Sequence, residues 1–200
     1  MKKNSIVGLL IGGLILFYFY FNNQSQYKSF APIDAVYHGS TNRNIKTFEP
    51  RSHHIRDEKE GSRVFATPSI RLASCYLFKW DDSWVHQSIS WKENNKADYK
   101  IIMVISDKTR FHQEDFGGAI YILPAFNFKY DENKGLGIYE WTSKKKVSAF
   151  TQINFSSALE AMRIFGVHVY FVNAEQFKHY LTLPGEEQEK FLLSLNANEK

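Results

Sequence analysis

The chain has 200 residues, of which 44% are hydrophobic and 23% are charged, a composition typical of globular proteins that excludes wholesale disorder. A single cysteine, Cys75, excludes an internal disulfide framework and a cysteine-based zinc site. The formal net charge is +4, and Lys2 and Lys3 supply two of these charges. The remainder is too weakly basic for a dedicated nucleic-acid binder.

The N-terminal segment is the first predicted element. No charged residue occurs between Lys3 and Lys28, and residues 6–21 are an unbroken run of apolar, aromatic and glycine residues. With its uncharged flanks, a helix over this run approaches the roughly 30 Å thickness of a bilayer core. We therefore expect a signal-anchor over residues 1–28, with one transmembrane helix that contacts the membrane through residues 6–21.

Two other interpretations of this segment compete with a retained anchor. A cleaved signal peptide needs small residues soon after the apolar run, and the first such triplet is the distant Ser29-Phe30-Ala31. A buried helix of a soluble domain would have to be covered on all its sides, because the run is apolar all round. Because Lys2 and Lys3 precede the run, the positive-inside tendency predicts a single-pass membrane protein whose domain, residues 29–200, is extracytoplasmic.

The domain pattern is one of short apolar strands with helices between and after them, which predicts an α+β fold. Strands are expected at residues 35–37, 63–66, 99–105, 119–123, 138–142, 147–153 and 167–172. The strands at 138–142 and 147–153 are expected to pair with each other, with Lys144–Lys146 in the turn between them.

Three helices are predicted from their capping residues and apolar spacing. Ser69 precedes a helix that continues towards Leu77. Ser156 or Ser157 caps a second helix, which Gly166 closes, and Pro184-Gly185 introduce the last one.

The sequence lacks the signature motifs of several common enzyme classes. There is no G-x-S-x-G elbow, no G-x-G-x-x-G and no G-x-x-x-x-G-K. Cys75 lies on an apolar helical stretch, which favours a small buried hydrophobe over a nucleophile. The histidines His53, His54 and His112 have no spacing that is diagnostic of a metal site.

One ordered set of short motifs stands out. These are Tyr37-His38-Gly39-Ser40, Phe48-Glu49-Pro50-Arg51, Val64-Phe65-Ala66-Thr67-Pro68 followed by a helix with Tyr76, and Tyr139-Glu140-Trp141. In this order they resemble the ADP-ribosyltransferase superfamily, in particular the diphtheria-toxin/poly(ADP-ribose) polymerase branch and small uncharacterised bacterial and phage proteins similar to it. The resemblance covers residues 35 to about 172.

The resemblance implies a split β-sheet with interspersed helices, and a transferase that moves ADP-ribose from NAD to an unknown acceptor. It implies that His38, Gly39 and Ser40 bind NAD. It further implies that Phe65 and Ala66 wall the nicotinamide pocket, that Tyr76 stacks on nicotinamide, and that Glu140 is the catalytic carboxylate. NAD is then a substrate, and no metal is expected.

Two departures from the family pattern bear on the acceptor and on activity. Val64 stands where a tyrosine usually precedes Phe-Ala, and Ile138 stands two residues before Glu140. The Glu-x-Glu or Gln-x-Glu pair of arginine- and asparagine-modifying transferases is therefore absent. The alternative is a non-enzymatic, membrane-anchored interaction or structural protein that keeps the fold without the reaction.

Overall fold

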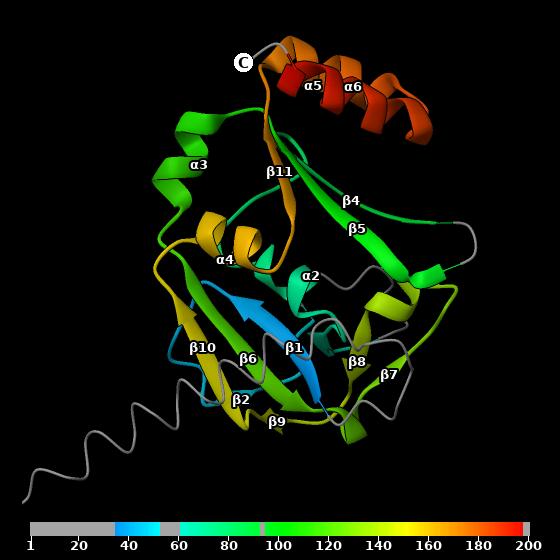
Figure 1. Cartoon of the computed structure of the whole chain (residues 1–200). Helices are drawn as coiled ribbons and strands as arrows, with labels where there is room; N and C mark the ends of the chain where they lie inside the picture. Colours follow the sequence, from blue (N-terminus) through cyan, green and yellow to red (C-terminus); the bar gives the residue numbers. More distant parts are fainter. Residues whose placement is uncertain (1–34, 53–60, 93–94, 198–200) are drawn as a thin grey trace, which may run out of the picture.

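The computed structural model describes residues 35–52, 61–92 and 95–197, and their elements form an α+β arrangement, as the sequence predicts (Figure 1). Strands β1 (Ala35–Ser40), β6 (Gly118–Pro124) and β10 (Thr151–Phe155) form one antiparallel sheet in the order β1-β6-β10. Strands β3 (Val64–Ala66), β8 (Trp141–Ser143) and β7 (Lys129–Tyr130) form another in the order β3-β8-β7.

A backbone bridge joins these two sheets. The Tyr37 N–H donates to the Thr67 carbonyl at 2.7 Å, and the Thr67 N–H donates to the Tyr37 carbonyl at 2.8 Å. Strand β1 therefore lies beside β3, and the strands follow one another from β10 across β6, β1, β3 and β8 to β7.

A third sheet has the order β11-β5-β4, with β4 (Val85–Lys92), β5 (Asn95–Ile105) and β11 (His168–Phe171). Strand β11 is parallel to β5, and β4 is antiparallel to it. The short pair β2 (Thr47–Phe48) and β9 (Val147–Ser148) packs on the sheet that contains β1, where Phe48 and Val147 join one buried apolar cluster.

The helices divide between the sheets and the outer surface. They are α2 (Ile70–Ser74), α3 (Lys108–Glu114), α4 (Ala158–Ile164), α5 (Ala174–Thr182) and α6 (Gly185–Ala197), with 3-10 turns η3 (Ala125–Asn127) and η4 (Gly137–Tyr139). Figure 1 shows α2 and α4 between the β1 and β5 sheets, and α5 with α6 beyond the far side of β5. The largest apolar cluster lies around α2, α4 and β5.

The predicted caps are confirmed. The Ser69 hydroxyl accepts a hydrogen bond from the Leu72 N–H at 3.1 Å, and the Ser157 hydroxyl accepts one from the Glu160 N–H at 3.1 Å. Gly166 follows α4 with a φ of 75°, a left-handed conformation that favours glycine at this position.

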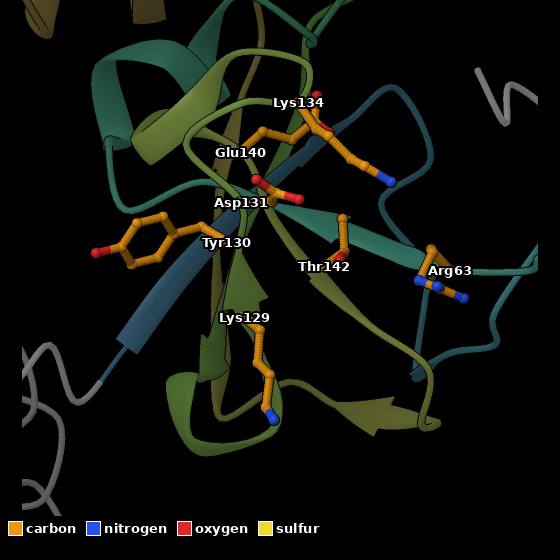
Figure 2. Close-up of a pocket in the computed structure, with 7 residues that line it drawn as sticks. All are labelled: Arg63, Lys129, Tyr130, Asp131, Lys134, Glu140 and Thr142. Carbon is orange, nitrogen blue, oxygen red and sulfur yellow. The ribbon is translucent and has the colours of Figure 1, made fainter. Parts of the chain in front are cut away.

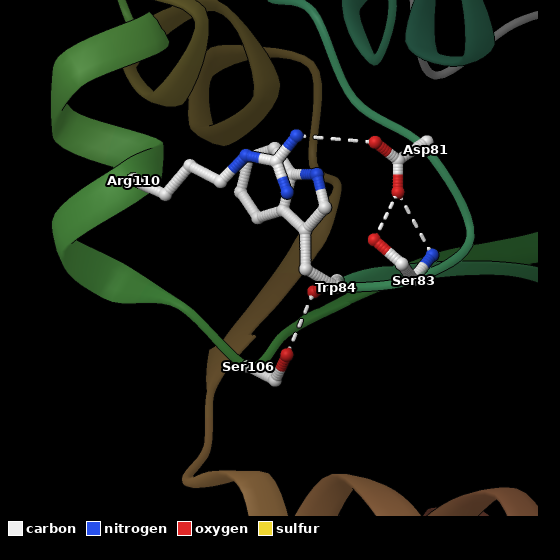
Figure 3. A network of polar contacts seen from close by, with 5 residues as sticks. All are labelled: Asp81, Ser83, Trp84, Ser106 and Arg110. Atoms are coloured by element: carbon white, nitrogen blue, oxygen red, sulfur yellow. Dashed lines mark hydrogen bonds and ion pairs between the residues drawn. The ribbon is translucent and has the colours of Figure 1, made fainter.

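Helix α3 is held against the start of β4 by a small polar network (Figure 3). The Arg110 guanidinium carbon lies 4.5 Å from the centre of the Trp84 ring, and Arg110 Nη2 lies 3.1 Å from Asp81 Oδ2. The Ser106 hydroxyl donates to the Trp84 carbonyl at 3.1 Å. Sequence periodicity did not predict α3, β4 or α5.

The predicted transmembrane helix is contradicted. Among the residues that the structure describes, no helix has both the length and the apolar character needed to cross a membrane. The longest described helix, α6, has 13 residues, spans about 20 Å and carries charged side chains, so it falls short of a bilayer core. Residues 1–28, with the apolar run 6–21, lie outside the described residues. The single-pass membrane localisation that the sequence predicted is corrected by the same finding.

The predicted hairpin of residues 138–142 with 147–153 is wrong. Residues 137–139 form η4, and β8 pairs with β3 and β7 instead. The following segment divides, with β9 pairing with β2 and β10 with β6. These distant strands bury Val147 against Phe48, which a local hairpin would not do.

Candidate functional site

Three predicted motifs lie on neighbouring strands. Strand β1 carries His38-Gly39-Ser40, β3 carries Phe65-Ala66, and Glu140 immediately precedes β8. Phe65 pairs with Thr142 and Ala66 with Trp141, so Glu140 lies just beyond the last register pair. Segments far apart in the sequence thus meet at one place.

The two faces of these strands have different surroundings. Successive side chains of a strand point to opposite faces. Val64, Ala66 and Trp141 belong to the apolar cluster around Phe48. Phe65 and Thr142 therefore face the other way, together with Glu140. The structure brings Phe65 and Glu140 to one face and places Ala66 in the core behind it.

His38 fixes β1 relative to β3. Its ring lies 4.7 Å from that of Phe48, on the core face, and its Nδ1 lies 2.7 Å from the Phe65 carbonyl oxygen. Because a carbonyl only accepts, Nδ1 carries the proton and Nε2 is left as an acceptor. Desolvation lowers the pKa of His38, the hydrogen bond to Phe65 opposes this, and the charge of Arg51 lowers the pKa further. The imidazole is therefore neutral at pH 7.

Ser40 ends the same strand, on the His38 side. Its hydroxyl accepts a hydrogen bond from the Asn42 N–H at 3.1 Å and so shapes the turn after β1. By strand alternation, the structure does not bring His38 and Ser40 to the face that holds Glu140.

Gly39 is the point where β1 meets α2. A Cβ atom at this position would lie 1.9 Å from the Ala73 carbonyl oxygen and 3.2 Å from the Tyr76 Cβ. The missing side chain therefore makes room for the helix, and the close approach brings Tyr76 over β1.

Tyr76 lies beside Trp80 and Gln87 at the edge of this face. Its side chain is 38% exposed, its ring is stacked 5.8 Å from that of Trp80, and its hydroxyl donates to Gln87 Oε1 at 3.3 Å. Desolvation raises the pKa of Tyr76, and the charges of Cys75 and Glu140 raise it further.

Glu140 is half-buried and lines a pocket of about 160 Å³ (Figure 2). Its backbone N–H donates to the Gly137 carbonyl at 3.0 Å, so the η4 turn places it at the start of β8. The other lining residues are Arg63, Lys129, Tyr130, Asp131, Lys134 and Thr142. Pockets that bury a drug-sized ligand have volumes of roughly 300–1,000 Å³, so this one accommodates only part of a dinucleotide.

Sequence reasoning missed Trp80, Gln87 and the cations of the pocket. No motif marked them, because they come from separate segments and meet only through strand pairing and the packing of α2. Arg63, for example, immediately precedes β3 and Lys129 begins β7, and both line the pocket.

The remaining candidates lie elsewhere. Cys75 is fully buried, as predicted, and desolvation raises the pKa of its thiol to about 12, which makes it a poor nucleophile. His112 stacks 6.0 Å from the Phe171 ring, and His53 and His54 lie outside the described residues. In the described ranges no three His, Cys, Asp or Glu side chains are grouped as metal ligands.

Comparison with known proteins does not assign the chain to a family. No family model, curated protein or solved structure matches the chain.

Proposed function

We propose that the protein is an NAD-consuming ADP-ribosyltransferase in which Glu140 is the catalytic carboxylate. The observation that carries the proposal is that Phe65 and Glu140 share one face of the paired strands β3 and β8. Glu140 immediately precedes β8, which pairs with β3, and β3 lies beside β1. Gly39 of β1 in turn packs against the backbone of α2 and the Cβ atom of Tyr76, which follows that helix.

The chemistry requires a carboxylate in this setting. The bond between ribose C1′ and nicotinamide breaks, and its electron pair leaves with nicotinamide. A nucleophilic atom of the acceptor then bonds to C1′ and releases its proton. Positive charge develops on the ribose as in glycoside cleavage, and a partly desolvated carboxylate such as Glu140 stabilises it.

The neighbouring aromatic residues supply a surface for the leaving group. The nicotinamide ring is flat, and the stacked Tyr76–Trp80 pair offers an aromatic surface. Phe65 shares the face with Glu140. His38 is a positioning residue, because its hydrogen bond to the Phe65 carbonyl fixes the β1–β3 geometry.

A matched pair of variants tests the role of Glu140. Nicotinamide release from NAD by the full chain, with water as acceptor, is expected to fall about 100-fold in Glu140→Gln, because a well-placed electrostatic group contributes this much. Glu175→Gln, an equal charge change on the exposed start of α5, is expected to keep the wild-type rate.

Two results would contradict the proposal. Equal rates in Glu140→Gln and wild type would exclude Glu140 from the reaction. An absence of both NAD binding and nicotinamide release in the wild type would favour the non-enzymatic interaction protein.

A further inference from the structure

We infer that the free edge of strand β4 pairs with the same strand of a second copy of the chain and so forms a two-fold dimer. The dimer is independent of the proposed reaction. It follows from the backbone groups that β4 directs away from β5, from the register that these groups allow, and from the side chains that this register opposes.

Strand β4 is an unprotected edge strand. It has eight residues, Val85–Lys92, and among the described strands it pairs only with β5, on the side opposite β11 (Figure 1). Folded proteins usually protect such an edge against pairing with a proline, a charged residue or a bulge. From Val85 to Ser90 the strand has no proline, Lys, Arg, Asp or Glu, and its register shifts only later, between Trp91 and Lys92. The strand therefore leaves its edge open to another strand.

Two residues of β4 direct their backbone groups to the free edge. The Ser106 N–H donates to the Trp84 carbonyl at 2.9 Å, so the backbone of Trp84 faces β5. Because alternate residues of an antiparallel strand bond to the same neighbour, the backbone of Ser88 also faces β5. The N–H and C=O groups of Gln87 and Ile89 then point away from β5, and no residue in the described ranges bonds to them.

An antiparallel pairing of two β4 strands satisfies these groups. Outward-facing residues pair with outward-facing residues, so Gln87 pairs with the partner's Ile89, and Ile89 pairs with the partner's Gln87. Each of these pairs exchanges two hydrogen bonds, so the N–H and C=O groups of both residues are satisfied. Ser88 then opposes the partner's Ser88 on the two-fold axis.

Neighbouring registers fit less well. A shift towards the start of the strand would need the Val85 N–H, which already donates to the Asp81 carbonyl at 3.1 Å. A shift towards its end would reach the irregularity between Trp91 and Lys92. The backbone therefore favours the register with Ser88 on the axis.

The side chains agree with this register. Ser88 is small, so two copies of it fit side by side at the axis. His86 opposes the partner's Ser90, and desolvation lowers the pKa of His86, so its ring is neutral at pH 7. Like charges directly opposite each other would destabilise the pairing, and from His86 to Ser90 this register opposes none.

Disulfide formation by cysteine variants of the full chain tests the register. Opposed residues of a non-hydrogen-bonded pair have Cα atoms about 4.5 Å apart, a separation that a disulfide spans. Under mild oxidation with oxidised glutathione, Ser88→Cys is therefore expected to give a covalent dimer as its main product on a non-reducing gel. The native Cys75 is fully buried and does not compete.

Ser90→Cys is the matched control, on an exposed residue of the same strand. In the inferred register the two copies of residue 90 are four positions apart along the pairing, about 14 Å, which is too far for a disulfide. Ser90→Cys is expected to give at least about tenfold less covalent dimer than Ser88→Cys.

The molar mass of the uncrosslinked chain, measured by light scattering, gives a second test. The wild type is expected to have the mass of two chains. Gln87→Pro removes an N–H group that β5 does not use, at both symmetric positions of the dimer. It is expected to raise the dissociation constant of the dimer at least about tenfold, because two hydrogen bonds are lost.

Three results would overturn the inference. One is equal crosslinking of Ser88→Cys and Ser90→Cys, and another is unchanged dimerisation of a folded Gln87→Pro variant. The third is a monomeric wild type, which would assign the edge to a strand of another protein. None of these measurements involves NAD, so loss of the proposed enzymatic function would leave their results unchanged.

Discussion

Gly39 is the residue whose substitution has the most direct structural consequence. A Cβ atom there would overlap the Ala73 carbonyl oxygen at 1.9 Å, so α2 has to move. Gly39→Ala is therefore expected to lower the free energy of unfolding by about 3 kcal/mol, the upper part of the range for overpacked sites. Urea denaturation measures it. Gly185→Ala, where nothing lies within 4 Å of the new Cβ, is the control and is expected to keep wild-type stability. Equal stability of Gly39→Ala and wild type would contradict the close packing of α2 on β1.

The lowered pKa of His38 predicts how the free energy of unfolding depends on pH. Its pKa in the folded state is lowered from 6.5, mainly by desolvation, so the unfolded chain takes up a proton at a higher pH than the folded one. The free energy of unfolding therefore falls as pH drops through 6.5. One such histidine contributes up to about 1.4 kcal/mol of this loss between pH 7.5 and 5.5.

The His38→Gln variant isolates this contribution. A glutamine amide can donate to the Phe65 carbonyl and does not titrate. Urea unfolding at pH 7.5 and 5.5 is expected to show a smaller loss in His38→Gln than in wild type, whereas His86, whose pKa is also lowered by desolvation, acts equally in both. The same pH-dependent loss in both proteins would show that His38 is not responsible.

At the scale of elements, helix α3 depends on the contact of Arg110 with Trp84. The guanidinium lies over the indole ring, and the indole Nε1 is buried without a hydrogen-bond partner among the described residues. A double-mutant cycle with Arg110→Ala and Trp84→Phe is expected to give a coupling energy of about 1 kcal/mol, as for a partly desolvated cation–π pair. The Asp81 contact is present in both backgrounds and cancels. Additive effects of the two substitutions would contradict this role of Arg110.

Elements with local signals were predictable, and those defined by distant partners were not. The Ser69 and Ser157 caps follow from residues within one turn of each helix. The strand expected at residues 138–142 failed because Gly137, with a φ of 59°, starts a 3-10 turn, and β8 pairs with β3 rather than with the segment after it.

The same distinction applies to the candidate site. Short motifs singled out Glu140 and Tyr76, and the charge of Glu140 is one of the causes that raise the pKa of Tyr76. The alternation of β1 and β3 directs His38 and Ala66 away from Glu140, which the motifs alone did not reveal. The cations Arg63 and Lys129 had no signal, because only the order β3-β8-β7 brings them to one pocket.

At the scale of the whole molecule, the sheets and the helix between them build the site. The strands β3, β8 and β7 supply the pocket that Glu140 lines. The packing of α2 against β1 places Tyr76, which follows the helix and bonds to Gln87 of β4. Helices α5 and α6 cover the far side of β5 and contribute no lining residue to this pocket.

The most direct test of this account is thermal unfolding of the full chain with and without millimolar NAD, followed by measurement of nicotinamide in the same sample. At about 100 times its dissociation constant, NAD is expected to stabilise the folded state by about 2.7 kcal/mol, which raises the unfolding temperature by several degrees. The account predicts this shift together with nicotinamide release that depends on Glu140. A chain that shows neither the shift nor the release would contradict it.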